Sequence, residues 1–241
     1  MAHPLCIKIN QNIKLLFCLS CKLEYFCKYM KHYPDEITSS KLYRHILTLS
    51  YNEIIPFVFH YLKKRTFPLV LYLFLLAISF TWFIIKCFVV STSHTFLQLG
   101  LHIVIGFVII PVLIVIPHEI LHIIPYFISG ARRIKVGAEW KNFYFYVTAD
   151  KFPVSRPVFI VIVLTPLIIV TSSFCLLTFS SSELWQLTFI ASLFVHLTMS
   201  AGDIALLNFY YIHRRKKIIT WDDVASKEAY FYEYGQLPGT E

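Results

Sequence analysis

Long apolar segments separated by short polar connections make up most of this chain. Four segments, Phe67–Val90, Leu97–Phe127, Pro157–Phe179 and Leu184–Ile212, are as long as the roughly 20 residues that a helix needs to cross a bilayer. The chain is 57% apolar and only 15% charged, which leaves too few polar residues to cover a water-soluble fold. The pattern therefore predicts an all-α polytopic membrane protein with four transmembrane helices.

Basic residues flank these segments unevenly. The 241 residues include 22 Lys and Arg against 14 Asp and Glu, a net charge of +8. Basic clusters at 63–65, 132–156 and 213–217 lie beside apolar runs, whereas the connections 91–96 and 180–183 contain no Lys or Arg. Since positive flanks stay in the cytoplasm, both termini and the connection between the second and third spans are predicted to be cytoplasmic. No free basic domain of the kind that binds nucleic acid is seen, so no nucleic-acid partner is expected.

Three regions follow from this reading. Residues 1–66 form an N-terminal cytoplasmic or interfacial region, 67–212 a transmembrane domain and 213–241 a cytoplasmic tail. In the first region the acidic pair Asp35-Glu36 marks a helix start. The apolar residues that follow it predict an amphipathic helix lying on the membrane surface. They are Leu42, Ile46, Leu47 and Ile54.

The second apolar segment contains the motif His118-Glu119-Ile120-Leu121-His122, an H-E-x-x-H sequence. Residues four apart lie on one face of a helix, so both imidazoles can bind one Zn²⁺ while Glu119 faces the adjacent water. Zinc suits imidazole and carboxylate ligands and can keep a fourth position open for water. Two His and a Glu inside a bilayer would otherwise cost several kcal/mol. We therefore predict zinc bound by His118 and His122, with Glu119 as the general acid and base; a structural polar cluster is the alternative.

Asp203 is the predicted third ligand, because it is the only acidic residue inside the fourth apolar segment. His118 and His122 lie 12 and 8 residues before Gly130, and Asp203 lies 10 residues before His213. At 1.5 Å per residue, all three are about 12–18 Å inside the same face. The neighbouring Gly202 is expected to let helices approach closely. Alternatives are a packing or proton-relay role for Asp203, with Glu139 or Asp150 as the ligand.

Other residues near the motif have more than one reading. His196 lies seven residues before Asp203, on the same helical face. It is expected to orient Asp203, to contact substrate or simply to pack. Pro117 and Pro125 bracket the motif, and they either kink the helix to admit water and substrate or mark its ends.

Residues 132–147 alternate polar with β-branched or aromatic side chains in two stretches, which predicts a short cytoplasmic β-hairpin between the second and third helices. Such a hairpin would offer an edge to which an extended substrate segment adds as a strand. The alternative is a ribbon that anchors aromatic rings among the lipid headgroups.

An H-E-x-x-H motif within a span, a hairpin after it and a Gly-Asp pair in a later span resemble the membrane zinc proteases related to the site-2 proteases. The chain is similar above all to a bacterial group of small four-span zincin peptidases. The resemblance covers about Pro68–Ile212 and implies zinc on His118, His122 and Asp203, Glu119 as the base, and intramembrane proteolysis. One feature departs from the pattern: site-2 proteases usually have Asp followed by Gly, whereas Gly202 precedes Asp203 here.

The sequence thus predicts a zinc-dependent intramembrane endopeptidase of the bacterial cell membrane. Its expected partners are the lipid bilayer and a membrane protein or peptide substrate cut near the cytoplasmic face. A non-catalytic membrane scaffold, a metal transporter or sensor, and a zinc enzyme with another substrate are the alternatives. The sequence indicates neither the oligomeric state nor the identity of the substrate.

Overall fold

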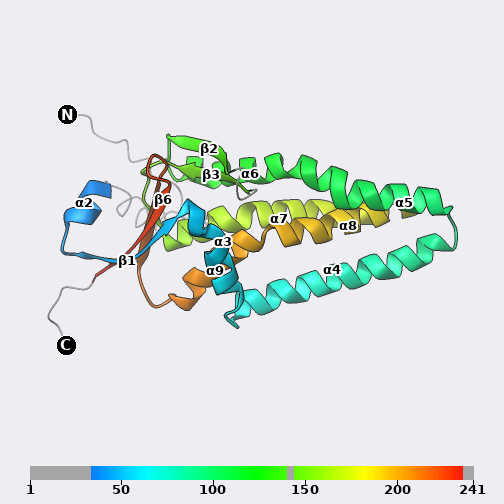
Figure 1. Cartoon of the computed structure of the whole chain (residues 1–241), viewed down its shortest axis with the longest axis horizontal. Coiled ribbons are helices and arrows are strands. Elements are labelled where there is room, and N and C mark those ends of the chain that lie inside the picture. The colour runs from blue at the N-terminus through cyan, green and yellow to red at the C-terminus, as the bar shows by residue number, and fades with distance from the viewer. Residues whose placement is uncertain (1–33, 140–143, 236–241) are drawn as a thin grey trace, which may run out of the picture.

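The computed structural model describes residues 34–139 and 144–235, so the first half of the predicted N-terminal region and the tip of the predicted hairpin lie outside the described residues. The long helices extend along the long axis of the molecule, and a small β-sheet lies at one end of them (Figure 1). The fold is mostly helical, but it contains more strand than the predicted all-α class with one hairpin.

Three helical stretches are long and apolar enough to cross a membrane: Phe67–Ser91, Phe96–Ile128 and Arg156–Ser180. The fourth predicted span is a pair of helices, α8 (Glu183–Met199) and α9 (Ala201–Ile212), bent by 47°. Large apolar side chains are exposed along these helices, as expected of surfaces that contact lipid. The helices in chain order are α4 (Phe67–Ser91), α5 (Phe96–Val104), the π-helical segment η2 (Ile105–Ile109), α6 (Ile110–Ile128), α7 (Arg156–Ser180), α8 and α9.

Local sequence explains where two of these helices begin and where the bend lies. Thr95 and Gln98 form a reciprocal capping box at the start of α5. Pro157 occupies the first turn of α7, where its missing N–H costs nothing. At the bend, both the backbone N–H and the hydroxyl of Ser200 donate to the carbonyl of His196, at 3.0 Å each. This contact closes the last turn of α8 and positions the start of α9.

The π-helical segment η2 is the point where the second span packs most closely on α8. A Cβ atom built on Gly106 would lie 2.6 Å from the carbonyl oxygen of Thr188 and 2.8 Å from Cβ of Ala191. Ser192 donates a 3.0 Å hydrogen bond to the carbonyl of Gly106. Gly106, and not Gly202, is therefore a close-approach glycine: a Cβ on Gly202 would meet nothing within 4 Å, so that expectation was wrong.

Substituting Gly106 by Ala should destabilise the helix bundle. The added methyl group meets backbone instead of a flexible side chain, and overpacking of this kind costs about 1–3 kcal/mol. Gly100→Ala in α5 is the matched control, because its Cβ meets nothing within 4 Å, and alanine should stabilise that helix by up to about 1 kcal/mol. Thermal unfolding in detergent should show opposite shifts in Tm; equal Tm values for the two variants would contradict this packing.

A four-stranded sheet joins the N-terminal and C-terminal parts of the described chain. Its strand order is β1-β6-β5-β4, with every neighbouring pair antiparallel. The amphipathic helix predicted from Leu42 to Ile54 was wrong, because this stretch contains β1 and the start of α3. A bulge between His45 and Leu47 breaks the two-residue alternation that marks a strand. The elements are α2 (Pro34–Ser39), β1 (Tyr43–Ser50), η1 (Tyr51–Glu53), α3 (Ile54–Leu62), β4 (Val154–Ser155), β5 (Ile218–Asp223) and β6 (Glu228–Tyr234).

The two alternating stretches after the H-E-x-x-H motif form paired strands. β2 (Ile134–Glu139) and β3 (Tyr144–Ala149) are antiparallel and lie in the chain between α6 and α7. The carboxylate of Glu139 pairs with the ammonium of Lys227, in the β5–β6 turn, at 2.8 Å. This ion pair connects the hairpin to the sheet.

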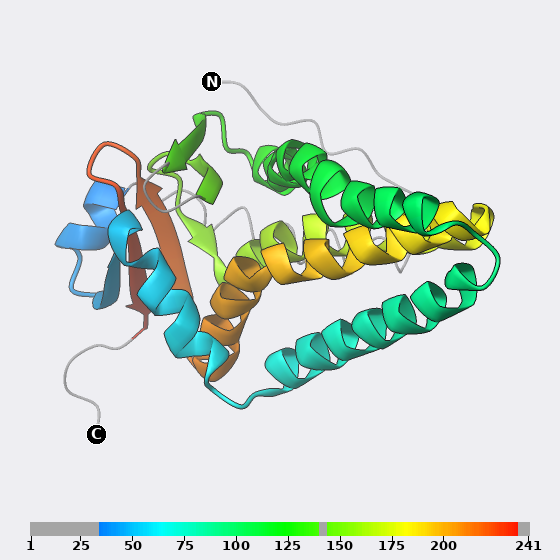
Figure 2. The same ribbon diagram turned by 45° about the vertical axis from the view of Figure 1, so that its right-hand side comes forward.

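One apolar core connects the sheet with the membrane helices. Phe209 and Tyr210 of α9 pack on Phe231 of β6, and Phe57 of α3 packs on Phe209. Figure 2 shows α3 and α9 side by side next to this sheet. Strands from the predicted N-terminal region and the predicted tail are thus fixed to the end of the bundle that carries the site.

Candidate metal centre

Three helix segments bring the predicted zinc-site residues together. His118, Glu119 and His122 lie on consecutive turns of α6, Asp203 lies in the first turn of α9, and His196 lies in the last turn of α8. The rings of His118 and His122 are 5.2 Å apart between centroids. The bend between α8 and α9 places Asp203 at the start of a new helix, from which its carboxylate reaches the two motif histidines.

The Asp203 carboxylate faces both imidazoles. Its Oδ2 lies 3.2 Å from Nε2 of His118, and its Oδ1 lies 3.8 Å from Nε2 of His122. Two ligands at about 2.0–2.2 Å from one tetrahedral zinc ion are about 3.4 Å apart, so these separations suit a shared ion. All three side chains are largely buried, with exposed fractions of 11%, 9% and 15% for His118, His122 and Asp203.

Hydrogen bonds to the far side of each ring orient the Nε2 atoms toward Asp203. His122 Nδ1 lies 3.0 Å from the carbonyl of Ile162, an acceptor, so Nδ1 carries the proton and Nε2 has a free lone pair. His118 Nδ1 lies 3.2 Å from Nε2 of His196, which can accept in the same way. Metal-binding histidines are usually held by such contacts from the other ring nitrogen.

One orphaned atom shows that a cation fits this centre. Asp203 Oδ2 is buried and accepts no hydrogen bond from the described residues, although His118 Nε2 is within 3.2 Å. His118 Nε2 therefore donates no hydrogen bond to this oxygen. A buried carboxylate oxygen without a donor is costly in an apolar setting, and a metal ion would satisfy it. Two imidazole nitrogens and a carboxylate oxygen are a donor set that suits zinc.

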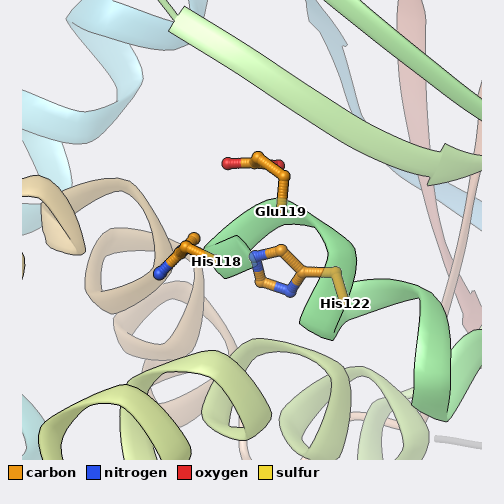
Figure 3. Close-up of side chains that lie close together, drawn as sticks. All are labelled: His118, Glu119 and His122. Atoms are coloured by element: carbon orange, nitrogen blue, oxygen red, sulfur yellow. The ribbon is translucent and has the colours of Figure 1, made fainter. Parts of the chain in front are cut away.

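Glu119 lies beside this centre. Figure 3 shows its carboxylate above the motif helix, with the side chains of His118 and His122 below it in this view. Donor atoms of His118, Glu119 and His122 still lie within 4.8 Å of one another. Glu119 is thus close enough either to exchange a proton with a water at the centre or to act as a ligand. The contacts of Asp203 with both rings favour the first role for Glu119.

A cavity of about 470 Å³ opens from the metal centre toward the β-sheet. Glu119, both motif histidines and Asp203 line one part of it. Most of its wall is apolar, and it includes strand β3 of the hairpin, helix α3 and strand β6. The volume lies in the range of cavities that bind small ligands or short peptide segments. Other lining residues include Phe57, Phe145, Val147, Phe159, Met199, Gly202 and Phe231.

The remaining predicted residues are placed as follows. Glu139 pairs with Lys227, and Asp150 accepts a 3.1 Å hydrogen bond from the backbone of Val224, so neither faces the metal centre. Pro117 and Pro125 both lie inside α6, so the reading that they mark helix ends was wrong. Gly202 lines the cavity and does not mediate helix packing.

Sequence reasoning missed the residues at the far part of the cavity. Asp222 of β5, Tyr51 of η1 and Thr148 of β3 line it together. Asp222 precedes a second Asp and a turn, which resembles an ordinary exposed loop in sequence. The aromatic residues of Glu228–Tyr234 are a strand signal that could have indicated a partner strand for Asp222.

Replacing His196 by Ala should weaken zinc binding by about 10–100-fold, since such outer contacts orient a ligand histidine. His196→Gln keeps a hydrogen-bonding oxygen for His118 Nδ1 and should recover most of the affinity. Ser192→Ala is the control, because Ser192 lies one turn away and bonds to Gly106 and Thr188 instead. Competition with a chromophoric chelator would measure the zinc Kd; equal Kd values for His196→Ala and Ser192→Ala would exclude this role.

The comparisons with known proteins agree with this geometry. Residues 111–219 match the profile of a family described as "Putative zincin peptidase". The matched segment runs from α6 through the hairpin and α7–α9 to the first residues of β5, and so contains every residue of the candidate centre. No curated protein and no solved structure matches the chain significantly. The similarity to this family is thus confined to residues 111–219, which are less than half of the chain.

Proposed function

We propose that this chain is a zinc-dependent endopeptidase of the membrane that cuts membrane-embedded or membrane-adjacent segments of other proteins. One observation carries the proposal: the Nε2 atoms of the largely buried His118 and His122 converge on the Asp203 carboxylate at a cavity that Glu119 also lines. The zincin-like family suggests a zinc metallopeptidase. The apolar helices around the centre suggest that its substrates are reached within or beside the bilayer.

The proposed orientation follows from charge. In it, α8 and α9 together form a fourth, bent span. The hairpin, the four-stranded sheet and both termini then face the cytoplasm of a bacterial cell. The basic connections at 63–65 and 213–217 support this arrangement. Cleavage would then occur near the cytoplasmic face, at the end of the bundle that the sheet covers.

Each polar residue of the centre has a distinct task. His118 and His122 would hold zinc through Nε2, and Asp203 would hold it through a carboxylate oxygen while offsetting part of its charge. Bound zinc supplies Lewis-acid chemistry, which makes water a stronger nucleophile and polarises a peptide carbonyl. Glu119 takes a proton from the attacking water at its carboxylate and delivers it to the nitrogen of the departing amine. The apolar cavity wall keeps bulk water away from these charges.

Strand β3 would present the substrate. Residues 145–148 of this strand line the cavity beside the metal centre, and among the described strands β3 pairs along its length only with β2. An extended substrate segment could pair with its backbone, which would expose one amide to the centre. The alternative is that the hairpin anchors aromatic rings at the membrane surface.

Metal depletion tests the proposal. Full-length protein would be reconstituted in liposomes with a pool of detergent-solubilised membrane proteins, and new protein termini would be counted by mass spectrometry. Chelation should abolish cleavage, and about one equivalent of zinc should restore it. Cleavage that persists without metal would contradict the proposal.

The same preparation separates the alternative functions. A non-catalytic scaffold should purify without stoichiometric zinc and generate no termini. A transporter should move zinc across the liposome membrane and should also generate none. Transporters further tend to show paired, interrupted helices in corresponding halves; within the described residues, only the α8–α9 pair is broken in this way.

A further inference from the structure

The cavity has a second polar region at the end formed by the β-sheet. Asp222 lines it, and both of its carboxylate oxygens accept hydrogen bonds from hydroxyl groups. Tyr51 donates to Oδ1 at 3.3 Å, and Thr148 donates to Oδ2 through a short contact. Tyr51 and Thr148 are each only 4% exposed. Three separate elements, η1, β3 and β5, therefore converge on one carboxylate inside the cavity.

This carboxylate has hydroxyl partners but no cation among the described residues. The lining residues of the cavity include Glu119, Asp203 and Asp222, but no Lys or Arg. Two basic residues of this region are paired with other carboxylates. Lys151, whose backbone N–H donates to the carbonyl of Asp222, pairs with Asp223 at 3.2 Å, and Lys227 pairs with Glu139 at 2.8 Å. Buried carboxylates are normally paired with a positive group, so Asp222 stands out.

The immediate neighbours of Asp222 do not compensate its charge. Tyr51 and Thr148, which contact its two carboxylate oxygens, carry uncharged hydroxyl groups. Burial raises the pKa of Asp222 from 3.8 to about 6, partly opposed by the hydroxyls of Thr148 and Tyr51. Burial thus disfavours the ionised form, and a positively charged group beside the carboxylate would stabilise that form.

We propose that Asp222, framed by Tyr51 and Thr148, is a specificity site for a positively charged nitrogen of the substrate. The inference rests on the proposed function, because it assigns this group to the molecule that occupies the same cavity. The group is an ammonium or guanidinium, carried either by a Lys or Arg side chain or by a free N-terminus. The apolar wall, which includes Phe57 and Phe231, suits the hydrocarbon stem or backbone leading to that charge.

Peptide binding tests the site without requiring cleavage. Full-length, zinc-loaded Glu119→Gln protein in an uncharged detergent would be titrated with three fluorescent peptides of one apolar sequence. The first is N-acetylated and contains norleucine. The second is N-acetylated and has lysine at the norleucine position. The third has norleucine and a free N-terminus. At least one charged peptide should bind about tenfold or more tightly than the neutral one, and the stronger of the two identifies the source of the cation.

Variants of neighbouring carboxylates locate the effect. In the same Glu119→Gln protein, the further substitution Asp222→Asn should bring the affinities for the three peptides within about twofold of one another. Asp223→Asn is the matched control: it removes the same charge from the next residue of β5, where the carboxylate pairs with Lys151, and it should leave the preference intact. Equal binding of all three peptides, or a preference that survives Asp222→Asn, would overturn the proposal.

A milder variant covers the case in which Asp222→Asn fails to fold. Asp222→Glu keeps the charge but moves it by one methylene, so the affinity for the preferred charged peptide should fall several-fold while that for the neutral peptide stays constant. Unchanged affinities for the charged and the neutral peptide would also overturn the proposal. Hydrolysis is tested separately by metal depletion. Absent cleavage would therefore contradict the proposed function, whereas equal peptide binding would contradict only the cation site.

Discussion

Asp203→Ala protein should purify without stoichiometric zinc and should cut no substrate. The substitution removes the carboxylate that lies 3.2 and 3.8 Å from the two Nε2 atoms, and it leaves two imidazoles to hold a divalent cation in a largely buried site. We expect the zinc affinity to fall on the order of a thousandfold or more, because both a ligand and its charge are lost. Elemental mass spectrometry of the purified protein would measure the zinc content directly.

Two acidic residues serve as controls for Asp203. Glu139→Gln and Asp150→Asn remove the carboxylates that were the alternative third ligands in sequence, and both lie away from the centre in the fold. Both variants should retain one zinc per chain. A zinc-loaded, active Asp203→Ala protein would instead make Glu119 the third ligand, in keeping with the closeness of its carboxylate to the two rings.

The predictions that agree with the structure rest on local chemistry. Apolar length identified the helices because a bilayer demands about 20 apolar residues, whatever lies next to them. The i, i+4 spacing of His118 and His122 fixes their common face within one helix. Asp203 lies beside them in the fold. It could be selected 81 residues after His122 only because charge is so rare inside apolar segments that few candidates exist. Its role as a ligand stays a prediction.

The failures arose where distant segments meet. β1 pairs with β6, although Tyr43 and its partner Tyr234 are 191 residues apart in sequence, and the bulge in β1 hides the alternation that would have revealed a strand. The role expected of Gly202 failed because its surroundings depend on a 47° bend that composition does not encode. Asp222 was missed for the same reason, since its burial requires Tyr51 and Thr148 from two other elements.

Glu119→Gln should retain zinc but lose turnover. The amide has nearly the same size as the carboxylate, so the motif helix and the three proposed ligands remain in place. It accepts no proton from water, however, and passes none to a leaving amine. Loss of a general acid–base group typically lowers kcat by about 10²–10⁴, and KM should change little because Glu119 holds no part of the substrate in the proposed mechanism.

Zinc content and cleavage must be measured on the same Glu119→Gln preparation, because only their combination separates the possible roles. Retained zinc with lost cleavage identifies a proton-transfer residue. Loss of both would make Glu119 a ligand, and retention of both would exclude it from the chemistry and favour a transporter or scaffold. Glu139→Gln provides the charge control, since its partner Lys227 lies in a turn of the sheet. In cells, intact membrane proteins that accumulate with Glu119→Gln but not with Glu139→Gln would be the candidate substrates.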